Sequence, residues 1–159
     1  MLGFKDHYEI HDHIEFLNVT TYDTQSSLPP AEILDILQEG NKRFVMDKPI
    51  HRNLSSEVKA SSYTQHPIAL VIGCIDSRVP IETVFDMGVG DVFVVRIAGN
   101  VINDDILAST EFACSMVGVK FVLVLGHTYC GAVKAACDGN EIKEGHLQEL
   151  LAKIKPAID

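Results

Sequence analysis

The sequence lacks three features that would each point to a particular class of protein. Its 159 residues hold 13 lysines and arginines against 22 aspartates and glutamates, for a net charge of -9. An acidic chain without a basic patch is a poor candidate for nucleic-acid binding. No apolar run is long enough to cross a bilayer, and the opening residues MLGFKDHYEIHDH lack the apolar core of a secretory signal. We therefore expect a soluble, cytoplasmic protein with no nucleic-acid partner.

Cysteines are few, and nothing in their number requires disulfide bonds. A chain of 159 residues can bury a real core without them, and in a reducing compartment an even number of cysteines does not imply bridges. Cys114 falls inside a predicted helix and Cys137 near the end of another, so we interpret both as packing residues. Cys74 and Cys130 follow predicted strands and are considered separately below.

The chain divides into a short tail and one domain. Residues 1–27 show little core-like pattern and end in TYDTQSSLPP, so we predict a tail or linker there, with HIEFLNV as a short strand within it. Pro29 and Pro30 then open a helix, a position that proline favours. We place a single domain over residues 28–159, a size typical of one domain.

Three apolar runs predict the strands of this domain, over residues 68–73, 91–97 and 119–125. The runs are continuously apolar, which is typical of a parallel sheet covered on both faces. Helical spacing, caps and terminal glycines predict helices between and after them. These helices are expected over 30–47, 80–88, 103–118, 128–139 and 146–158. The predicted fold class is α/β, with a mainly parallel sheet flanked by helices.

Polar side chains follow the first and third predicted strands where each strand ends. LVIGCIDSRVP places Cys74, Asp76 and Arg78 after the first strand, and GHTYC places His127 and Cys130 after the third. Ligands of open α/β sheets bind outside the carboxyl ends of the strands, where the strand order reverses. If the two strands are neighbours, about 4.8 Å apart, then the two cysteines, the histidine and the carboxylate can converge on one point.

Two thiolates, an imidazole and a carboxylate match the ligand preferences of zinc. Taken singly, each cysteine is more often a small buried hydrophobe, and His127 can simply cap a turn. The joint placement at two strand ends favours the metal site. Asp76 and Arg78 leave alternatives open: a salt bridge that holds the turn, a fourth zinc ligand that closes the site, or a pair that leaves room for water. Zinc lowers the pKa of a bound water to about 7 and yields a hydroxide nucleophile.

At these residues the sequence resembles the β-class carbonic anhydrases. CIDSRVP, GVGDVFVVRIAGN, STEFA, GVKFVLVLGH and HTYCGAVKAA follow the order and spacing of that family, over about residues 30–140. The resemblance implies that Cys74, His127 and Cys130 are the zinc ligands. It implies that Asp76 either binds zinc in a closed state or is released to Arg78 in an open state.

The same resemblance implies an activity and an assembly. The reaction is the reversible hydration of carbon dioxide to bicarbonate and a proton by zinc-bound hydroxide, and the working unit is a homodimer or a tetramer built from dimers. Gly99 falls in the segment that lines the family's substrate pocket. More loosely, HIEFLNV and DTQSSLPPAEIL are similar to the linker that joins a SulP-type bicarbonate or sulfate transporter to a carbonic anhydrase domain. This second likeness implies association with a membrane transporter through the N-terminal segment.

Departures from the family pattern keep other functions open. Family members usually continue for another strand and further helices, so we expect a C-terminally short domain. This leaves two alternatives: a non-catalytic domain whose zinc is structural and serves assembly or bicarbonate sensing, or a related hydrolase of carbon disulfide or carbonyl sulfide. Some members carry a non-catalytic bicarbonate site that uses a tryptophan. Since this sequence has none, we do not assign that site here.

Overall fold

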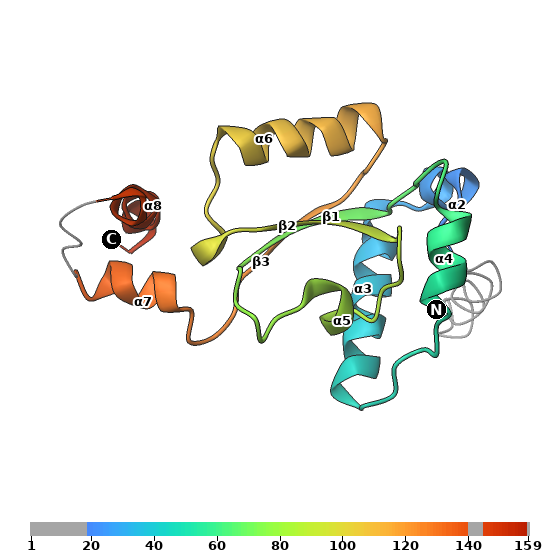
Figure 1. The fold of residues 1–159 in the computed structure, drawn as a ribbon, viewed down its shortest axis with the longest axis horizontal. Helices are drawn as coiled ribbons and strands as arrows, with labels where there is room; N and C mark the ends of the chain where they lie inside the picture. The colour runs from blue at the N-terminus through green and yellow to red at the C-terminus, as the bar shows by residue number, and fades with distance from the viewer. Residues whose placement is uncertain (1–18, 140–144, 159) are drawn as a thin grey trace.

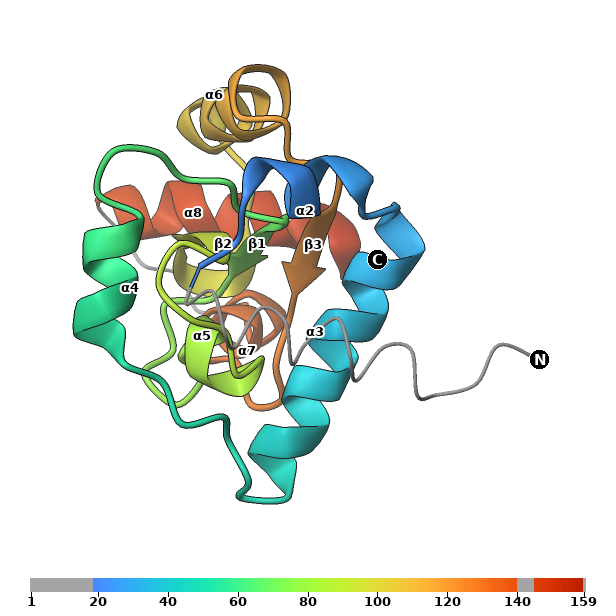
Figure 2. The ribbon, with the colours of Figure 1, turned by 90° about the vertical axis from the view of Figure 1, so that its right-hand side faces the viewer.

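A parallel sheet lies at the centre of the computed structural model, which describes residues 19–139 and 145–158. Within these residues three strands form the sheet: β1 (Ala69–Gly73), β2 (Val92–Arg96) and β3 (Val122–Leu125). Their order is β2-β1-β3, and both pairings are parallel (Figures 1 and 2). The α/β class and the three strands predicted from the apolar runs are confirmed.

Helices lie on both faces of the sheet and beyond the carboxyl ends of its strands (Figure 1). None of the helices in the described part of the chain is long and apolar enough to cross a membrane. The α-helices are α2 (Tyr22–Ser27), α3 (Pro30–Val45), α4 (Leu54–Ala60), α5 (Ile81–Val84), α6 (Asp104–Glu111), α7 (Gly131–Cys137) and α8 (His146–Ile154). Shorter helical turns are η1 (Ala98–Asn100), η2 (Phe112–Met116) and η3 (Lys155–Ala157).

Side-chain caps fix the starts of several helices. The side chain of Asn103 accepts a hydrogen bond from the backbone N–H of Ile106 at 3.0 Å, at the start of α6. Asn53 accepts from the N–H of Ser56 at 3.1 Å at the start of α4. Such caps satisfy N–H groups that have no partner within the helix. The cap that the sequence predicts at Asn103 or Asp104 is therefore Asn103.

The strands bury one face against α3 and α5. Ile33 and Leu37 of α3 and Ile81 of α5 pack against Val71 of β1, and all four side chains are fully buried. Figure 1 shows α3 and α5 on the side of the sheet opposite α6. The face of the sheet that packs against α3 and α5 therefore holds more buried core residues than the face that packs against α6.

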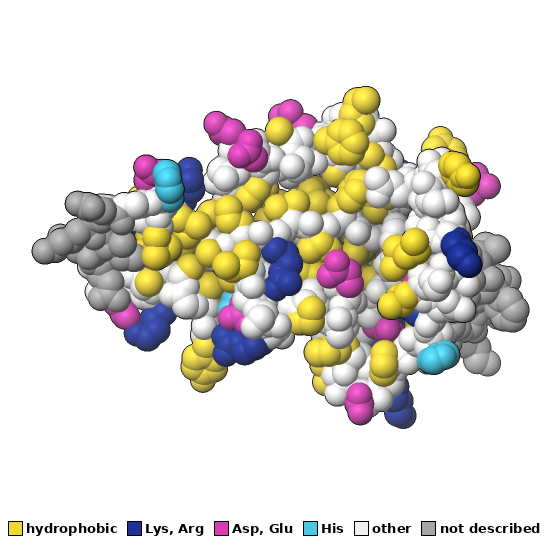
Figure 3. Space-filling view, viewed as in Figure 1, with side chains coloured by type: hydrophobic (Ala, Val, Ile, Leu, Met, Phe, Trp, Pro, Cys, Tyr) yellow, Lys and Arg dark blue, Asp and Glu magenta, His cyan; other side chains and the backbone are white. Residues whose placement is uncertain are grey.

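The opposite face is covered by α6 only in part. Ile106 packs against Leu70 and Ile72 of β1, but Val124 of the neighbouring strand is 55% exposed. A hollow of about 390 Å³ lies between α6 and β2, with Phe93 among its lining residues. Figure 3 shows a band of apolar side chains running below α6 on this side of the molecule.

The structure corrects the predicted linker near its end. Residues 22–27 form α2, because the Thr21 side chain caps this helix by accepting from the N–H of Thr24 at 3.2 Å. Gln25 of α2 is buried and donates to the carbonyl of Pro67 at 2.8 Å. This part of the chain therefore packs on the domain. The strand predicted at HIEFLNV lies outside the described residues, apart from Val19, which is not in a strand.

Two predicted helices end earlier than their sequence patterns indicate. The helix predicted over 80–88 stops at Val84, because Asp86 adopts a left-handed backbone with φ +49°. Its carboxylate accepts from Arg43 Nε at 2.5 Å and from the N–H of Ile50 at 3.1 Å. The helix predicted over 103–118 changes to a π-helical turn at Phe112. The contacts of Asp86 and its left-handed backbone therefore accompany the early end of α5, and the change to π-helical geometry at Phe112 marks the early end of α6.

Candidate metal centre

The fold brings Cys74, His127 and Cys130 together at one end of the sheet. The chain passes from β1 to β2 on one side and then to β3 on the other, so the strand order reverses between β1 and β3. This is where α/β proteins bind ligands. Gly73 and Leu125 are register partners at the ends of these strands. Cys74 follows Gly73 directly, and His127 follows Leu125 after one intervening residue, Gly126. The predicted convergence of the two strand ends is confirmed.

The three side chains form a compact group. One ring nitrogen of His127 and the two sulfurs lie within 4.8 Å of one another, and the sulfurs of Cys74 and Cys130 are 3.9 Å apart. Two sulfurs that each lie about 2.3 Å from one tetrahedral ion are about 3.8 Å apart. Both cysteines are buried and free of disulfide bonds. The sulfur pair therefore has the spacing that a zinc ion requires.

The orientation of His127 also suits a metal. Its Nδ1 lies 2.9 Å from the carbonyl oxygen of Thr128, an interaction in which Nδ1–H donates. This hydrogen bond selects the tautomer in which Nε2 carries the lone pair, as is usual for histidines that bind metals. Nε2 is buried and has no hydrogen-bond partner. Since buried polar atoms are normally paired, an unpartnered nitrogen beside two sulfurs fits a cation.

The group also favours the thiolate form of a cysteine. Burial alone would raise the pKa of Cys74, but the neighbouring His127 and the backbone N–H groups of Asp76 and Gly99 outweigh it, and the pKa falls to about 7. In turn, proximity to Cys74 raises the pKa of His127, although burial opposes the shift. The thiolate is the form of cysteine that binds metals.

Asp76 is held by Arg78. The Arg78 backbone N–H and Nε both donate to Oδ1 at 2.9 Å, and Nη2 donates to Oδ2 at 2.7 Å. This interaction with Arg78 holds the pKa of the Asp76 carboxyl well below its usual range. Oδ2 lies 3.9 Å from Nε2 of His127, so the carboxylate borders the Cys-His-Cys group while bonded to Arg78. Of the arrangements left open by the sequence, this structure contains the Arg78-bound one.

Gly99 lies against Cys74, in η1. Its backbone N–H donates to the Cys74 sulfur at 3.4 Å, and its φ of +66° is a conformation that favours glycine. A Cβ added there would lie 2.7 Å from Cδ1 of Ile154, which is too close. Gly99, which the resemblance assigns to the substrate pocket, therefore contacts the candidate metal centre through its hydrogen bond to Cys74.

Sequence analysis missed one residue that contacts this centre, Arg96 at the end of β2. Its Nε donates to the carbonyl of Cys74 at 2.9 Å, and its Nη2 donates to the carbonyl of Asp76 at 2.5 Å. A signal was present, because Arg96 is the first charged residue after the apolar run VFVV, at the carboxyl end of a strand. Ligand-binding residues gather at that end.

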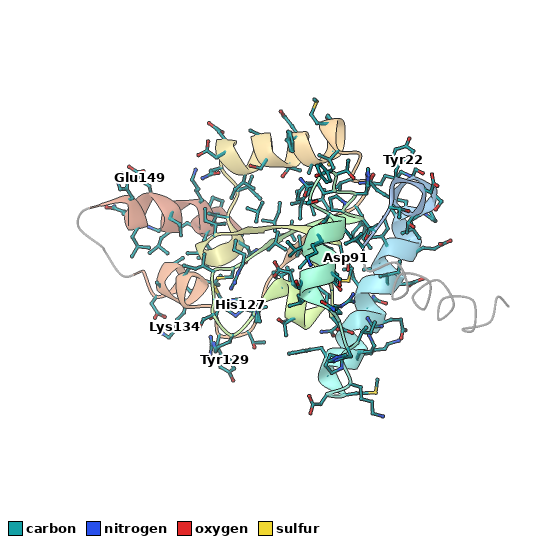
Figure 4. All side chains as sticks on the ribbon, turned by 45° about the vertical axis from the view of Figure 1, so that its right-hand side comes forward. Tyr22, Asp91, His127, Tyr129, Lys134 and Glu149 are labelled. Carbon is teal, nitrogen blue, oxygen red and sulfur yellow. The ribbon has the colours of Figure 1, made fainter. Side chains whose placement is uncertain are left out.

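The other two cysteines lie outside the group. Cys114 is half-buried in η2, consistent with packing, but Cys137 is exposed, which corrects its interpretation as a packing residue. Tyr129, between His127 and Cys130, is 89% exposed and has a φ of +57°. Figure 4 shows its side chain pointing away from the fold. Nothing in the structure explains this strained and exposed conformation.

Fold and site together define a parallel α/β protein with a Cys-His-Cys group at the switch point of its sheet. The chain belongs to the carbonic anhydrase family, whose profile matches residues 69–159. It is similar to the carbonic anhydrase of Mycolicibacterium smegmatis, with 43% identity over 133 residues that cover 81% of this chain and 65% of that protein. It thus spans less than two thirds of this relative.

Solved structures of β-carbonic anhydrases share this fold. The enzyme from Coccomyxa, in complex with acetazolamide, aligns with a TM-score of 0.60 and 26% identity, over 82% of this chain and 57% of that chain. A tetrameric β-carbonic anhydrase from Sordaria macrospora aligns with a TM-score of 0.56 and 25% identity, over 97% of this chain and 64% of that chain. The described fold is therefore that of the β-class, and it is shorter than these relatives.

Proposed function

We propose that Cys74, His127 and Cys130 bind a zinc ion and that the chain catalyses the reversible hydration of carbon dioxide to bicarbonate and a proton. The observation that carries this proposal is the buried Nε2 of His127, unpartnered beside two sulfurs 3.9 Å apart. Family membership and the similarity to carbonic anhydrases support it. Zinc, when bound, would acidify a water molecule to a pKa of about 7 and so supply a nucleophile at neutral pH.

In this proposal Asp76 orients the attacking water. Its carboxylate is ionised because Arg78 holds its pKa well below the usual range. Oδ2 faces the cluster 3.9 Å from Nε2 of His127, where it can accept a hydrogen bond from a water placed there. Accepting that bond fixes the direction of the lone pair that attacks carbon dioxide, which is the positioning part of general-base catalysis.

Arg78 keeps Asp76 away from the metal ligands. Its three hydrogen bonds occupy both carboxylate oxygens, and a bidentate Arg–carboxylate pair has a fixed planar geometry. A site closed by Asp76 as a fourth ligand would exclude water and leave zinc structural. The pairing with Arg78 therefore favours the catalytic proposal over a non-catalytic, structural one.

Stopped-flow measurement of carbon dioxide hydration between pH 6.5 and 9 tests this function, with the zinc content of the same sample measured in parallel. We expect one zinc per chain and a rate above that of buffer. Asp76→Asn should keep the zinc and lose most of the rate, because an amide cannot accept the hydrogen bond in the same way. A fully zinc-loaded chain that hydrates carbon dioxide no faster than buffer at any of these pH values would contradict the proposal.

The proposal extends to the assembly of the chain. A relative named as tetrameric supports a homodimer or a tetramer built from dimers, and size-exclusion chromatography with light scattering would measure the oligomeric state.

We propose a cytoplasmic location and association with a membrane transporter through residues 1–27, supported by the likeness of that segment to a transporter linker. Fractionation of cell extracts tests this: deletion of residues 1–18, which leaves α2 and its contact with Pro67 in place, should release the protein from the membrane fraction, and an unchanged distribution would contradict it.

A further inference from the structure

Arg96 bonds to the segment that carries both Cys74 and Asp76. The last sheet hydrogen bond of β1 joins the N–H of Ile97 to the carbonyl of Gly73 at 3.0 Å. Beyond that point the ladder ends, and the carbonyl of Cys74 needs another donor. Arg96 supplies it through Nε at 2.9 Å, and its Nη2 also donates to the carbonyl of Asp76 at 2.5 Å. One guanidinium therefore bridges two carbonyls of the same turn.

We propose that Arg96 is a positioning residue of the metal centre: by bridging these two carbonyls it fixes the turn so that the Cys74 sulfur faces His127 while the Asp76 side chain faces Arg78. The inference rests on the proposed zinc function and deepens it. The backbone of Asp76 is further tied by the N–H of Val79, which donates to the same carbonyl at 3.1 Å. Both donors hold the carbonyl of Asp76, so they fix the peptide group that follows this residue.

The chemistry of arginine suits this task. Its planar fork offers donors at Nε and Nη2 in a rigid arrangement, and that arrangement can bridge two acceptors at once. A lysine at the same position carries a point charge on a flexible stem, so it would bond one carbonyl or the other. Arg96 pairs in register with Gly73, which brings its side chain next to the turn. Because the residue is exposed, removing it takes little packing from the core.

The matched comparison is between Arg96 and Lys120. Lys120 is also exposed and also donates to a backbone carbonyl, that of Ser26 at 2.5 Å, but it lies far from the centre in the fold. Arg96→Met and Lys120→Met thus remove the same kind of contact in two places. Arg96→Lys keeps the charge and one hydrogen bond, so it should restore part of what Arg96→Met loses.

The first measurement is metal binding, by competition of zinc with a chromophoric chelator and by the absorption spectrum of the cobalt(II)-substituted protein. Loss of a partner that supports a metal ligand usually lowers affinity about 10- to 100-fold. We expect a loss of that size in Arg96→Met, a smaller one in Arg96→Lys and none in Lys120→Met. The sulfur-to-cobalt band, which reports thiolate coordination, should shift in Arg96→Met. Wild-type affinity and an unchanged band in Arg96→Met would overturn the inference.

A second measurement separates this inference from the zinc function. In the metal-free protein, Cys74 is 5% exposed, so the release of its turn should speed its alkylation by iodoacetamide, read by mass spectrometry. We expect about a 10-fold faster reaction of Cys74 in Arg96→Met, because a lost hydrogen bond can change a local opening equilibrium by about that factor, with Cys114 unchanged. If the wild-type chain binds no zinc, the proposed function fails while this readout still stands. Equal alkylation rates of Cys74 in wild type, Arg96→Met and Arg96→Lys would refute the positioning role.

Discussion

The sulfurs of Cys74 and Cys130 lie 3.9 Å apart, although 56 positions separate the two residues in the sequence. They meet because β1 and β3 are parallel neighbours and because Cys130 is the N-cap of α7, in the short segment that follows β3. Two thiolates at that separation repel each other in a buried site, where charges interact more strongly than in water. A cation between them removes the repulsion, so metal binding and the folding of this end of the sheet should be coupled.

Cys130→Ser should abolish tight zinc binding. A hydroxyl replaces one of the three ligand atoms, and the loss should exceed the roughly 100-fold that a supporting contact can cost. Metal analysis after dialysis measures the result. Cys114→Ser is the matched control, because Cys114 lies in η2, outside the Cys-His-Cys group. Equal zinc content in the two variants would exclude Cys130 as a ligand.

Arg78→Ala should slow carbon dioxide hydration without removing zinc. Asp76 loses the two hydrogen bonds from the Arg78 side chain and keeps only the one from the backbone N–H of residue 78, so its pKa rises toward the usual range. The freed carboxylate can then turn toward the metal ligands. Since a positioned acid–base group contributes about 100-fold or more, we expect a loss of that order in kcat.

Arg78→Lys separates geometry from charge in the same experiment. Lysine preserves the positive charge but not the two-point pairing with the carboxylate. In Arg78→Lys the pKa of Asp76 should therefore stay closer to its wild-type value than the rate of carbon dioxide hydration does. If Arg78→Ala hydrates carbon dioxide at the wild-type rate, Arg78 has no part in holding Asp76 for catalysis.

Arg43→Ala should lower the free energy of unfolding by about 3 kcal/mol, the lower end of the cost of removing one partner of a buried ion pair, because Asp86 keeps its bond from the N–H of Ile50. Asp86 is 6% exposed and accepts from Arg43 Nε at 2.5 Å. Urea denaturation measures the change. Lys42→Ala is the neighbouring control, since its pair with Glu39 is 57% and 36% exposed and should contribute less than about 1 kcal/mol. An equal decrease in the free energy of unfolding in both variants would show that the Arg43–Asp86 pair stabilises the fold no more than the exposed Lys42–Glu39 pair does.

Gly40→Ala should destabilise the fold strongly. A Cβ at this position of α3 would lie 1.8 Å from the carbonyl oxygen of Phe85, a backbone atom that cannot rotate away. Overpacking of this kind costs about 3 kcal/mol or more when the backbone must move. Thermal and urea unfolding would both register it. In Gly131→Ala the added Cβ has open space around it, so that variant should stay within about 1 kcal/mol of wild type. A Gly40→Ala chain as stable as wild type would contradict the close approach of α3 to Phe85.

The fold could be predicted where local signals act alone. Continuous apolar runs located all three strands, and Asn103 was one of two residues expected to cap α6. Prediction failed where distant contacts decide the outcome. Gln25 is buried by its bond to Pro67, 42 positions away, so the end of the predicted linker became part of the domain. The left-handed turn at Asp86 likewise depends on Arg43 in another helix.

The sequence by itself determined which side chains stand at the strand ends, since Cys74, His127 and Cys130 follow apolar runs that predict buried strands. It did not determine which partner holds Asp76, nor that Arg96 bonds to the same turn. The Arg96 contact depends on how β2 lies beside β1 in the sheet, whereas the Asp76–Arg78 pair forms within one turn. Only in three dimensions do the ends of these strands meet, and the hydrogen bonds of 2.9 and 2.5 Å from Arg96 to the carbonyls of Cys74 and Asp76 form only where they meet.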